Sequence, residues 1–229
     1  MIVEAGLGYI AHKKIQELNR LRDVKKNNPD YRIIDIGGGK EKHVPDKFDF
    51  IDATMDFRDV DKEHIKHFSG NINDPFLWEK VDKEVSEKGK YDYCICTHTL
   101  EDIAYPAYVL KKINQIAKAG IISVPSKYRE FKRFELDGII RGYSHHRWIV
   151  TMKNMKLKFF PKVSIVENIV FNDIGAISQP HIEELFVVWK DSIEFEIFNN
   201  DWLGPSPSEF FTNFTDQIKN TDEDTLIKV

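Results

Sequence analysis

Two acids flank a run of three glycines near the start of the chain. Asp35 lies in an apolar run just before Gly37, Gly38 and Gly39, and Asp52 ends a second apolar run 17 residues after Asp35. Glycines let a backbone approach a ligand closely. In nucleotide-binding folds, an acid at about this offset from the glycine turn binds ribose hydroxyls. The pattern therefore indicates a site for a ligand that contains a nucleoside.

The glycine loop is short. Residues 40–47 separate Gly39 from the second apolar run at Phe48, and Pro45 is among them, which leaves room for one turn of helix at most. A dinucleotide needs a helix N-terminus aimed at its pyrophosphate, so NAD and FAD are poor candidates. A cofactor with an adenosine and an amino-acid tail but no phosphate does not need that helix. The alternative is that the glycines form a tight turn and both acids only cap loops.

A second group of reactive side chains lies at residues 143–148. Tyr143, His145, His146, Arg147 and Trp148 place a base, a cation and aromatic walls close together. A histidine can accept a proton from a hydroxyl or amine near neutral pH, and we predict that His146 is this base. In an extended segment His145 and His146 would point to opposite faces, so no shared metal ion is expected. The alternative is that both histidines hydrogen-bond within a loop that Trp148 anchors.

Apolar runs and amphipathic segments alternate along the chain and must position these groups. We expect strands at 31–36, 48–53, 91–98 and 121–126, and helices at 10–24, 63–68, 73–89 and 104–120. Strands that are apolar throughout are typical of a parallel sheet covered on both faces. Residues 183–190 and 192–200, joined by a tight turn at Asp191, are expected to form an antiparallel closing pair. The predicted fold is α/β, a Rossmann-like three-layer sandwich with a mostly parallel sheet and an antiparallel closing strand.

We expect residues 1–229 to form a single domain with a basic insertion at about 126–182. Between residues 126 and 162, ten Lys or Arg stand against three acids, a charge of +7, although the whole chain carries −4. Such an insertion favours a small anionic acceptor or a sugar derivative near the active site. The alternative is a solvated basic face. The residues predicted to bind the substrate are Lys127, Arg129, Tyr143, His145 and Arg147.

Composition excludes several classes of protein. The net charge of −4 argues against a nucleic-acid partner, because phosphate neutralisation needs a basic excess. No signal pattern or apolar run long enough for a membrane span is present in the sequence. Cys94 and Cys96 lie too close in sequence for a relaxed disulfide, which favours a reducing, cytoplasmic location.

Several segments together carry a resemblance. The chain resembles the class I S-adenosylmethionine (SAM)-dependent methyltransferases, and most of all the small-molecule group whose first glycine loop leads almost directly into the second strand. The resemblance covers roughly residues 31–125 and, more weakly, 184–199. The segments that carry it are IIDIGGGKEKHVPDKFDFIDA, GNINDP, YDYCICTHTLEDI and VLKKINQIAKAGIISVPS.

The resemblance implies a role for each motif in binding SAM. Asp35 and the glycine run would lie against the methionine tail and ribose, and Asp52 would bind the ribose hydroxyls. Asn71 and Asp74, in GNINDP, would lie near the adenine amino group, with Asn71 standing where many members have aspartate. An amide can also hydrogen-bond adenine.

The segment THTLEDI matches the family segment after the fourth strand, often a Ser/Cys-His-x-Leu-Glu-His run. Thr97, His98 and Glu101 agree with it, and Asp102 replaces the last histidine. Ligands bind outside the carboxyl ends of parallel strands, so Thr97 and His98 are predicted to lie at the cofactor, and Glu101 to act as a catalytic or substrate-contacting group. The alternative is that His98 bonds the sheet edge and Glu101 caps the next helix.

These observations predict a methyltransferase that uses SAM to O- or N-methylate a small anionic metabolite or a sugar. A different class of function stays open: a non-catalytic methyltransferase-like protein that binds a partner through the basic insertion. Another Rossmann-like enzyme with an adenosine ligand is a third possibility, and the short glycine loop disfavours it.

Overall fold

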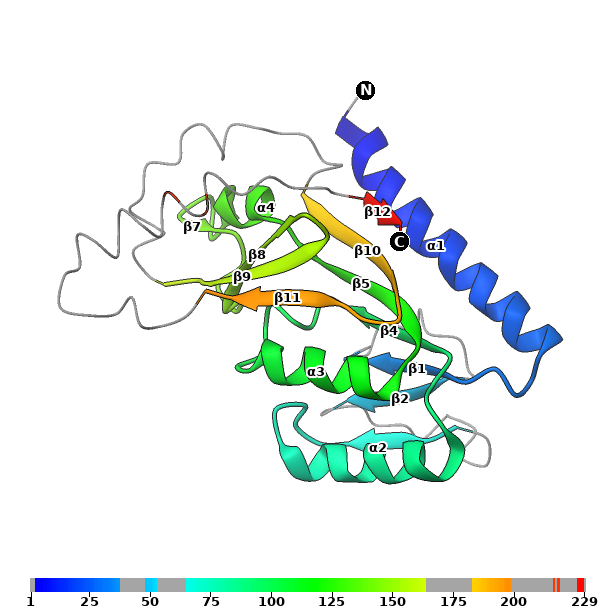
Figure 1. Ribbon diagram of the computed structural model, residues 1–229. Coiled ribbons are helices and arrows are strands. Elements are labelled where there is room, and N and C mark those ends of the chain that lie inside the picture. The colour runs from blue at the N-terminus through cyan, green and yellow to red at the C-terminus, as the bar shows by residue number, and fades with distance from the viewer. Residues whose placement is uncertain are drawn as a thin grey trace.

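A central sheet organises the protein. The computed structural model describes residues 3–37, 48–52, 65–163, 183–198, 216, 218 and 226–228, with side chains from residue 12 onward. Within these residues the sheet has the strand order β12-β10-β5-β4-β1-β2-β3 (Figure 1). Its strands are β1 (Ile33–Ile36), β2 (Asp49–Asp52), β3 (His67–Ser69), β4 (Tyr93–Thr97), β5 (Ala119–Pro125), β10 (Glu184–Lys190) and β12 (Leu226–Lys228). Only the β10–β5 pair in this sheet is antiparallel.

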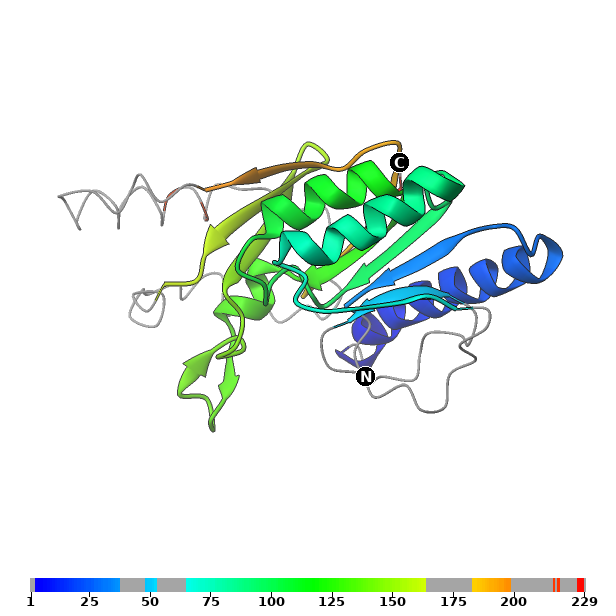
Figure 2. The same cartoon turned by 90° about the horizontal axis from the view of Figure 1, so that it is seen from below.

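Helices cover both faces of the sheet. Helix α1 (Val3–Asn27) lies on one face, and α2 (Pro75–Lys88) and α3 (Pro106–Ile116) lie on the other (Figures 1 and 2). Successive residues of β4 point to opposite faces: Tyr93 and Ile95 pack with Leu21 of α1, while Cys94 and Cys96 pack with residues of α2 and α3. Burial on both faces explains why this strand is apolar throughout. The predicted three-layer α/β sandwich with an antiparallel closing strand is confirmed.

A smaller structure follows β5 within the predicted insertion. It comprises α4 (Lys127–Phe131), the short strands β6 (Arg133–Glu135) and β7 (Ile140–Arg141), and the hairpin of β8 (Trp148–Lys153) and β9 (Lys156–Pro161). Strand β11 (Glu194–Ile197) runs parallel to β9 and completes a three-stranded sheet. Residues 164–182 of the predicted insertion lie outside the described residues.

Two predictions about single elements were wrong. Strands β10 and β11 do turn at Asp191, whose φ is +67°, but β10 pairs with β5 and β11 pairs with β9, so they do not form a pair with each other. A helix was expected at residues 63–68, but residues 67–69 form β3 at the sheet edge, where Phe68 is buried. Helix α1 is present as predicted but longer at both ends.

Two further expectations bear on the cellular setting. In the part of the chain that the structure describes, no helix combines the length and apolar character needed to cross a bilayer. Cys94 and Cys96 are buried free thiols, and burial raises the pKa of both well above the usual value. Both thiols are therefore part of the core.

Candidate functional site

Asp35 is a buried acid at the carboxyl end of β1. Its side chain is 1% exposed, and its Oδ1 has no hydrogen-bond partner among the described residues. Burial, and next the negative charge of Asp52, raise the pKa of Asp35 to about 7. Removing a carboxylate from water without a partner is costly. Such an oxygen is therefore suited to a donor group on a ligand.

Gly37 makes the turn that follows β1. Its φ is +74°, a conformation that glycine adopts readily, and its N–H donates to the carbonyl of Ile51 at 2.9 Å. A Cβ added to Gly37 would stand 2.3 Å from Thr99 Oγ1. The Thr99 hydroxyl in turn lies 3.3 Å from the Ile36 carbonyl. Gly37 is therefore required both by the turn and by Thr99, whereas Gly38 and Gly39 lie outside the described residues.

The predicted adenosine-binding residues follow β2 and β3. Asp52 ends β2 with 8% of its surface exposed, and its carbonyl accepts the Gly70 N–H at 3.3 Å, which brings the end of β3 beside it. Asn71 accepts the Asn73 N–H at 2.9 Å. Asp74 accepts the Phe76 N–H at 3.0 Å and caps α2. Asn71 and Asp74 are thus near the expected edge of the sheet, but both make local hydrogen bonds.

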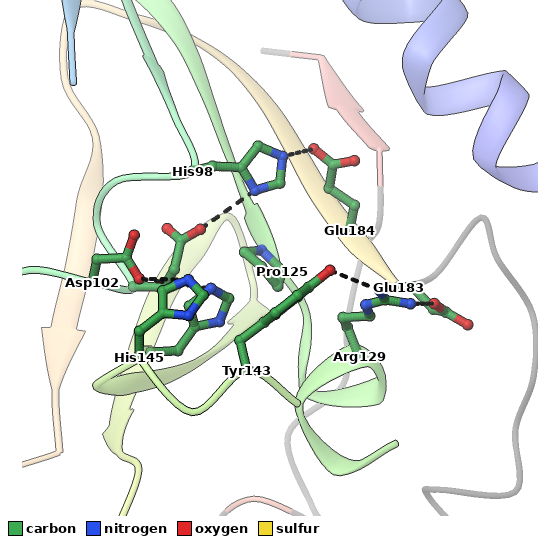
Figure 3. A pocket seen from close by; sticks show the side chains of 10 residues that line it. His98, Asp102, Pro125, Arg129, Tyr143, His145, Glu183 and Glu184 are labelled. Carbon is green, nitrogen blue, oxygen red and sulfur yellow. Dashed lines mark hydrogen bonds and ion pairs between the residues drawn. The ribbon is translucent and has the colours of Figure 1, made fainter. Parts of the chain in front are cut away.

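A cavity of about 350 Å³ opens where β4 and β5 end (Figure 3). It joins the segment after β4 to α4, to the residues before β8 and to the start of β10. Six of the predicted site residues line it together: His98, Glu101, Arg129, Tyr143, His145 and His146. Asp102, Pro125, Glu183 and Glu184 complete the wall. Lys127 and Arg147 do not line it: Lys127 is buried with its Nζ 3.3 Å from the Ile218 carbonyl, and Arg147 is exposed.

His98 bridges two carboxylates across this cavity. Its φ is +49°, and its Nδ1 lies 3.4 Å from Glu101 Oε1 while its Nε2 lies 3.2 Å from Glu184 Oε1 (Figure 3). Burial acts to lower the pKa of His98, but the hydrogen bonds to Glu101 and Glu184 outweigh it and raise the pKa to about 9. Lys14 of α1 also pairs with Glu184. These contacts favour the protonated imidazole, which makes His98 a poorer proton acceptor than an ordinary histidine.

Glu101 is buried at the base of the cavity. Its side chain is 1% exposed, and neither carboxylate oxygen has a hydrogen-bond partner among the described residues. Its backbone carbonyl accepts the N–H groups of Arg147 and Trp148 at 2.7 and 3.1 Å. These bonds hold the histidine segment against the end of β4. The Trp148 indole donates to the Ile103 carbonyl at 2.8 Å and anchors the same segment.

The two histidines share one side of the cavity. The His146 N–H donates to the Tyr143 carbonyl at 3.2 Å, so the segment turns and is not extended. The ring centroids of His145 and His146 are 4.6 Å apart. The expectation that the two rings point to opposite faces was therefore wrong, because it assumed extended backbone. His146 is buried, and its Nδ1 lies 2.7 Å from Glu130 Oε1.

Carboxylates pair with three cations of the basic insertion. Arg129 donates to Glu183 Oε2 at 3.0 Å and to the Tyr143 hydroxyl at 2.7 Å (Figure 3). Lys132 donates to the other oxygen of Glu183 at 2.8 Å. Lys162 donates to Glu130 Oε2 at 2.7 Å. These cations are therefore already paired inside the protein.

Several residues of the site were not singled out from the sequence. Thr99, Glu130, Glu183 and Glu184 have no local motif that marks them, and Asp102 was noted only as a departure from a family pattern. Gly142 is the one indirect signal: its φ is +59°, and a Cβ there would stand 2.4 Å from Glu130 Oε2. A glycine at that position thus leaves space for the Glu130 carboxylate.

Comparison with known proteins bears on the family. The family described as "Methyltransferase domain" matches residues 7–156. The search of curated proteins gives no match. The methyltransferase domain of bacterial CtHen1-CN is 16% identical, with 57% of this chain and 75% of that chain covered and a TM-score of 0.33.

Two structures of the N-terminal domain of EvdMO1 are also similar, one with SAH (S-adenosylhomocysteine) bound and one in the presence of SAH and D-fucose. Each is 12% identical and covers 76% of this chain, with a TM-score of 0.31. The covered share of those chains is 65% and 66%. The family match spans well over half of the 229 residues. The chain belongs to the methyltransferase-domain family and is a SAM-dependent methyltransferase.

Proposed function

We propose that this enzyme transfers the methyl group of SAM to a hydroxyl of a small, uncharged, hydroxyl-rich acceptor of the sugar type. One observation carries the proposal: a single segment, residues 97–102, separates the glycine turn from the cavity. Thr99 in this segment contacts Gly37, and Glu101, two residues later, lines the cavity. The segment thus lies between a cofactor site at the end of β1 and an acceptor site at the ends of β4 and β5.

The residues at the end of β1 and β2 fit SAM. The unbonded, buried Oδ1 of Asp35 offers an acceptor to the charged amino-acid tail, and Gly37 leaves free the space that a side chain would fill. Asp52, at the end of the neighbouring strand, is placed to accept ribose hydroxyls through charge-assisted hydrogen bonds. When bound there, SAM supplies the activated methyl group.

His146 is the residue proposed to take the acceptor's proton. Glu130 accepts from Nδ1 and leaves Nε2 facing the cavity side on which Asp102 lies, 3.6 Å away. A carboxylate that orients an imidazole in this way also stabilises the imidazolium that forms when Nε2 accepts a proton. Methyl transfer asks little more of the protein than alignment and this proton transfer.

The charges around the cavity favour an uncharged acceptor over an anionic one. Arg129 and protonated His98 are its cations, and both already contact carboxylates. The carboxylates in its wall are Glu101, Asp102, Glu183 and Glu184. An anionic acceptor would therefore meet an excess of negative charge, whereas hydroxyl groups can donate to the unbonded oxygens of Glu101.

The test has two stages. Calorimetric titration with SAM and SAH should first show one binding site per chain. Release of SAH should then be measured with a panel of neutral monosaccharides and glycosides, each paired with its phosphorylated derivative. We expect turnover with a neutral member that its phosphate does not improve. A phosphate with kcat/KM ten times that of its parent would disprove the uncharged acceptor, and absence of SAM binding would disprove the cofactor site.

A further inference from the structure

Three side chains meet at one edge of the cavity with the donor set of a metal ion. Asp102, His145 and His146 each offer one ligand atom, and these atoms all lie within 4.8 Å of one another. His145 Nε2 lies 3.9 Å and His146 Nε2 lies 3.6 Å from the same oxygen, Oδ1 of Asp102 (Figure 3). Each imidazole therefore directs its Nε2 toward Oδ1 of Asp102.

These distances are too long for hydrogen bonds and close to those between ligands of one ion. An N–H···O bond needs about 2.7–3.2 Å between heavy atoms, and Asp102 Oδ1 is buried without a hydrogen-bond partner among the described residues. Ligands bound at about 2.1 Å from one ion stand roughly 3.0–3.5 Å from each other. Small side-chain rotations would bring the three atoms to that spacing.

Two further observations support a cation site at Asp102, His145 and His146. Glu130 accepts from His146 Nδ1 at 2.7 Å, and metal-binding histidines characteristically donate their other ring N–H to a carboxylate in this way. Glu101, adjacent to Asp102 in sequence, lines the same cavity with 1% exposure; its Oε1 lies 3.4 Å from His98 Nδ1, and its Oε2 has no hydrogen-bond partner among the described residues. Two neighbouring carboxylates that each bury an oxygen without a hydrogen bond are a costly arrangement, which a cation near Asp102 would relieve.

We propose that Asp102, His145 and His146 bind a divalent transition-metal ion of the Mn²⁺ or Zn²⁺ class, with its remaining coordination positions open to the acceptor cavity. Imidazole and carboxylate donors without a thiolate favour such an ion. Mg²⁺ and Ca²⁺ prefer oxygen ligands alone and fit two imidazoles poorly.

Binding of the ion does not depend on the proposed function. The role of the ion in catalysis rests on that function. A hydroxyl of the acceptor coordinated at an open position would have its pKa lowered by the ion and would release its proton to water. The His146 Nε2 lone pair would then hold the ion and would not accept the proton. Removing the ion with EDTA therefore distinguishes His146 as a metal ligand from His146 as a proton acceptor. Activity that depends on the ion is lost with EDTA, whereas proton transfer to His146 is not.

The binding test needs neither SAM nor an acceptor. Wild-type protein dialysed against EDTA should be titrated calorimetrically with MnCl₂, ZnCl₂ and MgCl₂. We expect one Mn²⁺ or Zn²⁺ per chain at micromolar concentration, and much weaker binding of Mg²⁺. His145→Ala and Asp102→Asn should weaken binding at least tenfold, and Glu130→Gln by roughly 10- to 100-fold. The His145 side chain is 61% exposed, so its removal should leave the fold intact.

His12→Ala is the matched control, because His12 is an exposed histidine on α1 that pairs with Gln16 and lies outside the cavity wall. It should bind the ion as the wild type does. The proposal is overturned if the wild type binds neither Mn²⁺ nor Zn²⁺ below 1 mM, a ceiling equal to about 4 kcal/mol of binding free energy, or if His145→Ala binds as tightly as the wild type. Metal binding without methyl transfer would leave the site standing and contradict the proposed function. Full methyl transfer by EDTA-treated enzyme would contradict the catalytic role of the ion but not its binding site.

Discussion

Nδ1 of His146 lies 2.7 Å from Oε1 of Glu130, and both side chains are buried. Glu130 comes from α4 and His146 from the turn before β8, so the contact joins two parts of the insertion. Lys162 donates to the second oxygen of Glu130 at 2.7 Å. With its carboxylate held from both sides, Glu130 leaves His146 one nitrogen with which to act in the cavity.

Replacing His146 by alanine should therefore reduce turnover strongly. We expect kcat to fall by roughly 10²–10⁴-fold with little change in SAM affinity, because the imidazole acts on the acceptor and not on the cofactor. Glu130→Gln should lower kcat less and shift its pH dependence, since an amide cannot stabilise the imidazolium. The measurements are kcat against pH and calorimetric SAM binding. A His146→Ala enzyme with the wild-type rate would assign the histidine pair to the scaffold.

Asp52→Ala should weaken SAM binding at least tenfold. Two ribose hydroxyls donating to one carboxylate contribute roughly 1.5–3 kcal/mol each, and the residue lies at the carboxyl end of β2. Calorimetry with SAM and SAH measures the effect, and circular dichroism checks the fold. Unchanged affinity in a folded variant would remove Asp52 from the site.

Gly37→Ala should abolish SAM binding and destabilise the protein. The added Cβ meets Thr99 Oγ1 at 2.3 Å in addition to the strain of a φ of +74°. Gly89→Ala is a matched control: φ is +81°, and nothing lies within 4 Å of its added Cβ. It should lose roughly 1–3 kcal/mol of unfolding free energy, because its ψ of 175° is also unfavourable for alanine, and should bind SAM normally. Equal effects of the two substitutions on binding would show that the contact with Thr99 is unimportant.

The His98–Glu184 pair should make stability depend on pH at both ends of the range. Burial lowers the pKa of His98, but its bonds to Glu101 and Glu184 outweigh this and raise it to about 9. Its contribution is full below the unfolded value near 6.5 and is lost as pH rises through about 9. Burial raises the pKa of Glu184, but His98 and Lys14 lower it to about 2. That contribution is full above about 4.5 and is lost as pH falls through about 2.

Urea unfolding at pH 6 and pH 10 provides the measurement. The wild type should lose more unfolding free energy over this interval than His98→Gln, whose side chain does not titrate. Parallel losses in the two proteins would show that His98 is not protonated in the folded state.

The arrangement of the residues at the proposed cofactor end could be predicted from local sequence. A continuous apolar run predicts a buried parallel strand. The residues that follow such strands meet at one edge of the sheet. Asp35, Gly37 and Asp52 could therefore be placed together without coordinates. The family segment after β4 likewise pointed to His98 and Glu101, which line the cavity.

The acceptor end depended on contacts between residues far apart in the chain. Glu130 and His146, and likewise Arg129 and Glu183, meet only after the insertion has folded over the end of β5, and nothing in the local pattern selects one partner over another. The net charge of the insertion was visible in its composition, but its neutralisation by Glu183 and Glu130 was not. The same reason explains the pairing of β11. A tight turn after β10 suggests a hairpin, yet β11 pairs with β9, which comes beside it only in the folded chain.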